Sequence, residues 1–302
     1  MVFSRLLLLF FLYAFLGWCC EVAFAAIKCG EFINRGFLNG PVCPIYGFGV
    51  IGVALALSPI EDQLWLLYLG SVVLTTGIEF ITGWALEKLF HTRWWDYSDS
   101  PMNIMGYVCV PFSMLWGVAC VVIVRYAHPM IERAAAALPF WACATMDAVF
   151  GLIFVFDLVA TVIAVRELSD RLARITQAAQ ELRAISDELG QTIFDTTQTA
   201  QERARVGAAA VQTRGAGVWN QLEARQARIE QWLNAHRPHP DAAVESVRAR
   251  FESAKQRVTR AMEEKGFDHR RLLAAFPNLK SLQYQESLEA LREFYNRHRI
   301  KR

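Results

Sequence analysis

Five apolar stretches in the first half of the chain constrain its fold more than any other feature. A membrane-spanning helix needs about 20 apolar residues and must satisfy its own backbone hydrogen bonds across the hydrocarbon core. The stretches are Leu6–Ile27, Val42–Ile60, Leu64–Leu86, Ile104–Ala127 and Phe140–Val165. The second is the shortest and starts among Gly and Pro residues, so a re-entrant course is its alternative. The sequence predicts an all-α, polytopic membrane helix bundle with five spans.

Charge divides the chain into two parts. Residues 1–165 hold only 7 of the 31 Lys and Arg and 11 of the 29 Asp and Glu, and residues 166–302 hold the rest. The first part therefore has a net charge of −4 and the second of +6. This split excludes a secreted disulfide domain, a disordered chain and a simple soluble enzyme. We predict a transmembrane domain at 1–165 and a cytosolic α-helical tail at 166–302.

Basic residues indicate the orientation of the spans. A signal peptide is the rival interpretation of the first stretch, because Ala23-Phe24-Ala25 resembles a cleavage site. However, only Arg5 precedes the stretch, whereas Lys28 and Arg35 follow it. The loop at 87–103 and the tail are also basic. By the positive-inside rule, the N-terminus lies outside a cell membrane and the C-terminus in the cytosol.

The tail has the periodicity of packed helices. Apolar residues step by four and three in a heptad seam, which is typical of a coiled coil or helical hairpin. The seam is Leu168, Leu172, Ile175, Ala179, Leu182, Ser186, Leu189 and Ile193, and a later run is Val244, Val247, Phe251, Ala254, Val258 and Ala261. The first seam either forms a homodimer or meets a last helix near Leu288 and Leu291. Acids interleave with the bases throughout, so the tail is not predicted to bind nucleic acid.

Carboxylates inside the spans are the most informative residues. An ionised carboxylate at the bilayer centre costs ~3 kcal/mol, so each one needs a partner, a proton or a wet cavity. Glu21, Glu79 and Asp157 lie late in odd-numbered spans and therefore share the cytosolic half of the bilayer, and Glu87 ends the third span. Arg35 is the nearest candidate cation. We predict that it lies within about 5 Å of Glu21, Glu79 or Glu87.

Two segments between the spans are unsuited to regular helix. Glycines and prolines interrupt residues 30–47, which include Tyr46, and Trp94–Ser98 includes an interfacial tryptophan pair and Asp96. Irregular backbone at membrane depth is tolerated where it is packed in protein or lines water. Asn103 opens the fourth span from the same side. Carboxylates suit Mg²⁺ or Mn²⁺, but no His stands at ligand spacing in the spans, so no metal or other cofactor is predicted.

These motifs together resemble the ABC-transporter type IV family of bacterial membrane proteins. They are Gly17-Trp18 before Glu21, Asn34–Pro41, Pro44–Gly47, Glu79 with Gly83 and Glu87, Trp94–Ser98, Asn103, Gly106 and Trp116-Gly117. The resemblance covers about residues 8–125, and Phe276–Ser281 is similar to tails seen on such proteins. It implies a permease-like protein of the bacterial inner membrane.

The leading functional hypothesis is a transport-related permease subunit with a polar carboxylate and arginine site. The predicted substrate-binding residues are Glu21, Arg35, Tyr46, Glu79, Glu87, Asp96 and Asn103. The chain has no phosphate-binding loop of the type Gly-x-x-x-x-Gly-Lys-[Ser/Thr], so it is not predicted to be an enzyme by itself, and a separate ATPase subunit is the expected partner. The alternatives are an intramembrane enzyme that acts on a lipid-linked substrate, and a membrane scaffold whose helical tail binds partners.

Overall fold

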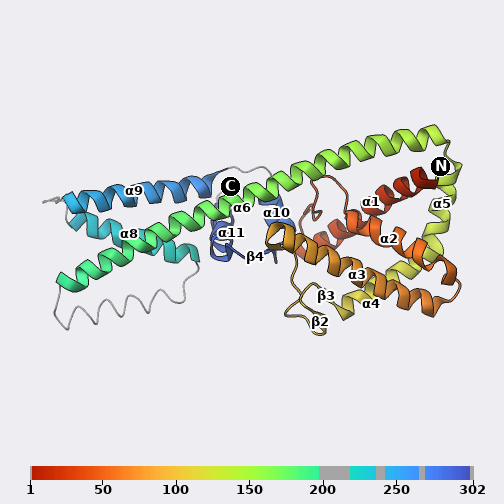
Figure 1. Ribbon diagram of the computed structural model, residues 1–302, viewed down its shortest axis with the longest axis horizontal. Helices are drawn as coiled ribbons and strands as arrows, with labels where there is room; N and C mark the ends of the chain where they lie inside the picture. Colours follow the sequence, from red (N-terminus) through yellow and green to blue (C-terminus); the bar gives the residue numbers. More distant parts are fainter. Residues whose placement is uncertain (1, 197–217, 236–241, 265–268, 300–302) are drawn as a thin grey trace. The chain divides into compact units, whose positions relative to one another are not determined.

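The computed structural model describes residues 2–196, 218–235, 242–264 and 269–299 (Figure 1). The chain forms two compact units. The first, the membrane unit, comprises Met1–Arg166 together with Asp268–Leu282, and the second, the tail unit, comprises Glu167–Phe267 and Gln283–Arg302. A short segment far along the sequence therefore packs with the membrane unit.

The membrane unit is a bundle of apolar helices, which confirms the predicted all-α class. In chain order its helices are α1 (Val2–Cys29), α2 (Pro44–Leu57), the 3-10 turn η1 (Ser58–Ile60), α3 (Leu64–Phe90), α4 (Val110–Val122), the π-helical turn η2 (Ile123–Ala127), α5 (His128–Ala137) and the first half of α6 (Phe140–Thr196). Neighbouring helices in the chain, such as α1 and α2 or α3 and α4, pack side by side.

The count of five full-length spans was wrong by one. In the described residues, four helices are long and apolar enough to cross a membrane, namely Val2–Cys29, Leu64–Phe90, Val110–Ala137 and Phe140–Glu188. The α2 helix is 14 residues long, which is about 21 Å against a hydrocarbon core of about 30 Å. It is short because the backbone before Pro44 is irregular and no helix starts until that residue supplies a favourable first turn.

The α2 helix still carries the chain from one end of the bundle to the other. Tyr46 at its start contacts Glu21, which is late in α1. Asp62, just after η1, pairs with Arg125 in η2, which follows α4. We call the end that holds residues 30–43 and 91–109 the loop end, and the other the opposite end.

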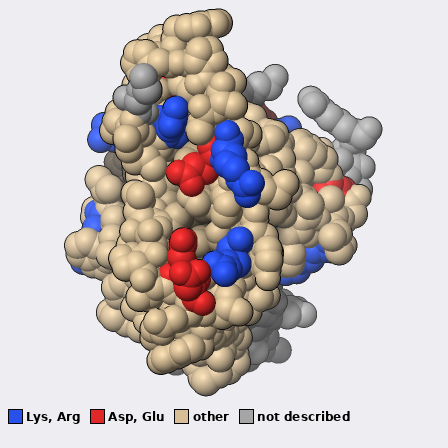
Figure 2. Space-filling view, turned by 90° about the vertical axis from the view of Figure 1, so that its right-hand side faces the viewer, with Lys and Arg blue, Asp and Glu red and all other residues tan. Residues whose placement is uncertain are grey.

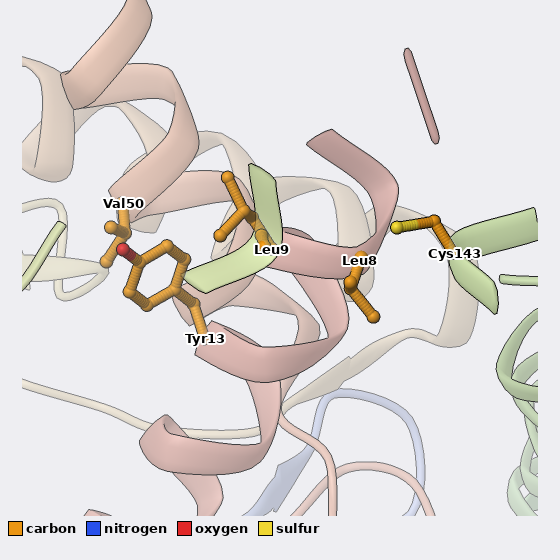
Figure 3. Packing of buried hydrophobic residues seen from close by; sticks show 6 residues of the cluster. Leu8, Leu9, Tyr13, Val50 and Cys143 are labelled. Carbon is orange, nitrogen blue, oxygen red and sulfur yellow. The ribbon is translucent and has the colours of Figure 1, made fainter. Parts of the chain in front are cut away.

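Close approach of α1 and α2 depends on glycine. A Cβ at Gly17 would lie 2.3 Å from the ring of Tyr46, so a larger residue would separate the helices. Further along the same interface, Tyr13 lies beside Val50 and Leu8 faces Cys143 of α6 (Figure 3). This buried cluster fixes α2 and α6 against α1.

The opposite end of the membrane unit carries few charged side chains, and most of those in view lie close to a charge of the opposite sign (Figure 2). In that view basic side chains lie beside acidic ones. Arg125 and Asp62 form an ion pair at this end. Ser4 donates a hydrogen bond to the buried Asp147, and the Tyr13 hydroxyl lies 2.8 Å from Nδ1 of His128. These contacts tie α1 to α5 and α6.

Short strands organise the loop end. The strands β1 (Thr92–Arg93) and β4 (Lys280–Ser281) pair antiparallel, as do β2 (Asn103–Ile104) and β3 (Val108–Cys109). The turn between β2 and β3 has positive φ at Met105 and at Gly106, the combination of a type I′ turn. A Cβ at Gly106 would lie within 3 Å of Ser98, Asp96 and Arg93. Glycine is therefore required both by the backbone and by the side chains packed on it.

The segment that joins the membrane unit from the tail consists of α10 (His269–Ala275), a turn at Pro277 and β4. Leu272 and Leu279 are almost completely buried, and so is Ala275. We call residues 269–282 the docked segment.

The tail unit contains the second half of α6, α8 (Val218–Ala235), α9 (Ala242–Glu263) and α11 (Gln285–Arg299). The α6 seam packs within the chain. Thr176 bonds Ser287 of α11, and Leu288 and Leu291 are fully buried, as the intrachain alternative predicts. The buried positions include Ala178 and Ile185 in place of the predicted Ala179 and Ser186, because α6 contacts both α9 and α11 rather than one partner.

The later run of apolar residues in the tail is buried from Val247 to Ala261, as predicted. The side chains of Leu189, Ile193 and Val244 and the turn at 236–241 lie outside the described residues. Arg171, fully buried, donates hydrogen bonds to the carbonyl oxygens of Ala261 and Met262 in the last turn of α9. A cation there satisfies the free carbonyls of that helix end. A homodimer through this tail remains a prediction.

Candidate functional site

Three of the predicted site residues meet at the loop end. Nε of Arg35 lies 3.4 Å from Glu21, which confirms the predicted pairing of Arg35 with a span carboxylate. The Tyr46 hydroxyl donates a 2.6 Å hydrogen bond to the other carboxylate oxygen of Glu21. We call these three residues the open cluster, because about a quarter of the Glu21 and Arg35 side chains is exposed. The cluster offers a hydrogen-bond acceptor and a cation side by side.

The loop that carries Arg35 is held from inside the bundle. The Trp18 indole donates a hydrogen bond to Asn34, whose own amide group donates to the carbonyl oxygen of Asn39. Asp157 of α6 accepts hydrogen bonds from the backbone amides of Asn39 and Gly40, at 3.0 and 2.7 Å. Irregular backbone at this depth needs such partners, since no water replaces them in the bilayer core. Asp157 therefore has a defined role in supporting the loop.

Glu79 of α3 lies near the open cluster. Its carboxylate lies close enough to Glu21 for the two to repel each other, and it interacts with the hydroxyl of Tyr97. Burial and the Glu79 carboxylate raise the pKa of Tyr97, so its hydroxyl stays a hydrogen-bond donor. Within the part of the chain that the structure describes, no Lys or Arg lies at ion-pair distance from Glu79.

Glu87 and Asp96 belong to a second group of charges. Nε of Arg93 lies 2.8 Å from Glu87, and its NH1 nitrogen lies 3.4 Å from Asp96. Asp96 also accepts hydrogen bonds from Lys280 and Ser98. We call the four charged residues Glu87, Arg93, Asp96 and Lys280 the closed network. Burial disfavours a charged Asp96, whose side chain is 6% exposed, but the bonds from Lys280 and Ser98 prevail and hold its pKa well below the usual value.

Asn103 lies outside both groups and supports the loop itself. Its amide nitrogen donates to the carbonyl oxygens of Ser98 and Ser100, and its oxygen accepts from the backbone amide of Gly106. These bonds shape the hairpin that packs on the closed network. Its contacts are those of a residue that fixes loop geometry.

Sequence reasoning missed three cations near these residues. Arg93 is one of the bases in the loop at 87–103 that indicate orientation, but it also binds Glu87, six residues earlier in the chain. Lys280 and Arg271 come from the docked segment, and Arg271 donates hydrogen bonds to the carbonyl oxygens of Gly36, Phe37 and Leu38. The similarity of Phe276–Ser281 to family tails was the only signal for this segment. In the described residues, no three His, Cys, Asp or Glu side chains are grouped to hold a metal ion.

Comparison with known proteins identifies one family. Residues 8–162, about half of the chain, match the family described as "Putative ABC-transporter type IV". This match covers all seven predicted site residues and Asp157, and it ends before the tail unit. Comparisons with curated proteins and with solved structures give no match. The chain is therefore a multi-pass membrane protein that belongs to the ABC-transporter type IV family.

Proposed function

We propose that the chain is a permease subunit and that its substrate binds at the open cluster together with Glu79. The observation that carries this proposal is the difference in pairing between the acids. The Glu21–Arg35 pair is partly exposed to solvent. Glu79 lies near Tyr97 and Glu21, with no cation at ion-pair distance in the described residues. An acid in such a layer is costly unless a ligand, a proton or water compensates it. A polar or cationic substrate group supplies that compensation.

The remaining predicted residues support this site at a distance. Glu87, Asp96 and Asn103 hold the loop from which Tyr97 reaches Glu79. We therefore assign substrate contact to Glu21, Arg35, Tyr46 and Glu79 in this proposal. Loop support is assigned to the other three.

We also propose that the loop end faces the cytosol. The loops there carry Arg35 and Arg93, and the tail that follows α6 is basic, as the positive-inside rule requires. Labelling tests this orientation. With the native cysteines replaced, Glu61→Cys is expected to react with an impermeant thiol reagent added outside intact cells, and Glu230→Cys only after lysis. The reverse pattern contradicts it.

The energy source is expected to be a separate ATPase, because the sequence has no phosphate-binding loop. The full chain is purified in mild detergent with a tag at its C-terminus, and co-purifying ATPases are identified and assayed. Under the proposal an ATPase co-purifies, and Glu21→Gln and Glu79→Gln each lower its coupled activity at least about tenfold, which corresponds to about 1.4 kcal/mol. The exposed Glu61→Gln is the matched control.

Two outcomes contradict the permease role. If no ATPase co-purifies and Glu79→Gln instead changes the lipid-linked products of the membrane, the chain is an intramembrane enzyme. If the ATPase binds but only tail substitutions reduce its activity, the chain is a scaffold. A homodimer is tested in the same preparation by its mass in detergent.

A further inference from the structure

The docked segment, residues 269–282, contacts both loops of the site. The chain enters it from the tail unit and returns to the tail unit after Leu282. Its residues nevertheless pack in the membrane unit, where Leu272 and Leu279 are buried. The region that matches the family ends at residue 162, so this segment lies outside it.

Arg271 binds the loop that carries Arg35. Its guanidinium donates to three successive carbonyl oxygens, those of Gly36, Phe37 and Leu38, at 2.7 to 3.2 Å. Asp157 binds the next amides of the same loop, at Asn39 and Gly40. A cation therefore holds the carbonyl groups of residues 36–38, and an anion holds the amide groups of residues 39 and 40. One of these two charges comes from the docked segment.

The other half of the docked segment binds the loop that carries Arg93. Strand β4 pairs with β1, so Lys280 lies opposite Arg93 and Ser281 opposite Thr92. Lys280 bonds Asp96 at 2.5 Å, and the backbone amide of Leu282 donates to the carbonyl oxygen of His91. The ring of Phe276 packs edge-on against Trp94, with centroids 5.0 Å apart. Strand pairing, a charge pair and an aromatic contact together form a peptide-recognition surface.

We propose that the docked segment is a clasp on this surface, which holds together the two arginine-bearing loops at the open cluster and lets the tail control access to it. The clasp rests on the proposed function in one respect, since the access that it controls is access to the proposed substrate site. That the segment holds the two loops is inferred from the contacts described above. Because coupling is reciprocal, loosening the segment opens the loops, and loosening the loops releases the segment.

The native Cys43 reports on loop opening without any substrate. It is buried beside Glu21 and Arg35, where the loop enters α2. In the full chain with the other six cysteines replaced, the rate of Cys43 alkylation by N-ethylmaleimide measures how often the loop opens. Arg271→Ala is expected to raise this rate about tenfold, since it removes the three charge-assisted hydrogen bonds to Gly36, Phe37 and Leu38. Arg271→Lys is expected to fall in between, and the exposed Arg166→Ala is the matched control.

A locked clasp separates loop opening from general unfolding. Thr92 and Ser281 are directly opposed in the strand pair, so Thr92→Cys with Ser281→Cys is expected to form a disulfide on oxidation. N-ethylmaleimide is expected to alkylate Cys43 more slowly in the oxidised protein than in the reduced one. Equal rates before and after locking would show that the loop opens independently of the segment and would overturn the clasp.

A second experiment measures how often the docked segment itself is released. Trypsin cleavage after Lys280 requires β4 to leave β1, so Asp96→Asn is expected to speed cleavage about tenfold relative to the exposed control Asp99→Asn. An unchanged cleavage rate overturns the clasp. Neither readout needs substrate or an ATPase. Failure here therefore leaves the permease proposal standing, and failure of the ATPase experiment leaves the clasp standing.

Discussion

The open cluster and the closed network lie at the same end of the membrane unit and are built from the same residue types, yet they differ in how completely their charges are paired. In the closed network, Arg93 lies between Glu87 and Asp96, and Lys280 adds a second cation. In the open cluster, Arg35 meets one oxygen of Glu21 at 3.4 Å, and both side chains stay partly exposed.

This difference distinguishes stability from binding. The two acids of the closed network are largely buried and paired with cations, so breaking the network strands a buried charge. A loosely held and partly wet pair contributes little to folding and keeps its groups available. We therefore expect substitutions in the closed network to act on folding and those in the open cluster to act on function.

The largest effect is expected from Arg93→Ala. The substitution leaves Glu87 and Asp96, whose side chains are 12% and 6% exposed, without their shared cation. Removing one partner of a buried ion pair costs about 3–5 kcal/mol. We expect a clear fall in the Tm of the detergent-solubilised protein, and Arg93→Lys should recover part of it. A Tm equal to that of Arg35→Ala would erase the distinction between the two groups.

A smaller effect is expected from Gly106→Ala. The new Cβ would lie within 3 Å of Arg93 and Asp96 of the closed network and of Ser98, at a φ of +75°. A residue held in a sparsely populated backbone region costs of order 1–3 kcal/mol. Tm should fall by less than in Arg93→Ala, and the trypsin site at Lys280 should become more accessible. Gly77→Ala is the matched control, because a Cβ there meets nothing within 4 Å and its φ is not in the positive range.

The sequence predicted one of these two groups better than the other. The pairing of Arg35 with a span carboxylate followed from the depth of the carboxylates in the spans and from Arg35 being the nearest cation. The closed network depends on a chain reversal at His91, which has a φ of +50°, and on a strand from residue 280. Hydropathy and periodicity carry no information about such a long-range pair.

The helices show the same limit. Apolar runs located every span, but they did not show that α2 is only 14 residues long, because the run Val42–Ile60 includes two residues before the helix and the 3-10 turn after it. In the tail, the heptad pattern predicted most of the buried face of α6, but not Ala178 and Ile185. It did not predict Arg171, whose charge is acceptable in the core because the last carbonyl groups of α9 and the hydroxyl of Tyr295 accept its hydrogen bonds.

Tyr46→Phe tests the open cluster with little disturbance. The change removes the 2.6 Å hydrogen bond to Glu21 and keeps the ring that packs on Gly17. A hydrogen bond to a charged group is worth about 1.5–3 kcal/mol when it is buried, and less here because Glu21 is partly wet. We expect Tm to change by no more than about a degree or two, while ATPase coupling falls several-fold. A large loss of Tm with coupling intact would mean that the cluster is structural.

The smallest effect, and the most specific to the closed network, is a pH response that begins only in acid. The pKa of Asp96 is lowered in the folded protein from the roughly 3.9 of an unfolded chain, because the bonds from Lys280 and Ser98 outweigh burial. A carboxylate of this kind contributes stability that is fully present above the unfolded pKa and is lost as pH falls toward the folded one. The Tm difference between the native protein and Asp96→Asn should therefore stay constant from pH 8 to pH 5 and shrink below about pH 4.

Lys280→Ala should weaken this acid response, since it removes one of the bonds that lowers the pKa of Asp96. If the difference instead changes between pH 8 and pH 5, another group titrates in the network, and its charges are not as completely paired as the contacts of Arg93 and Lys280 indicate.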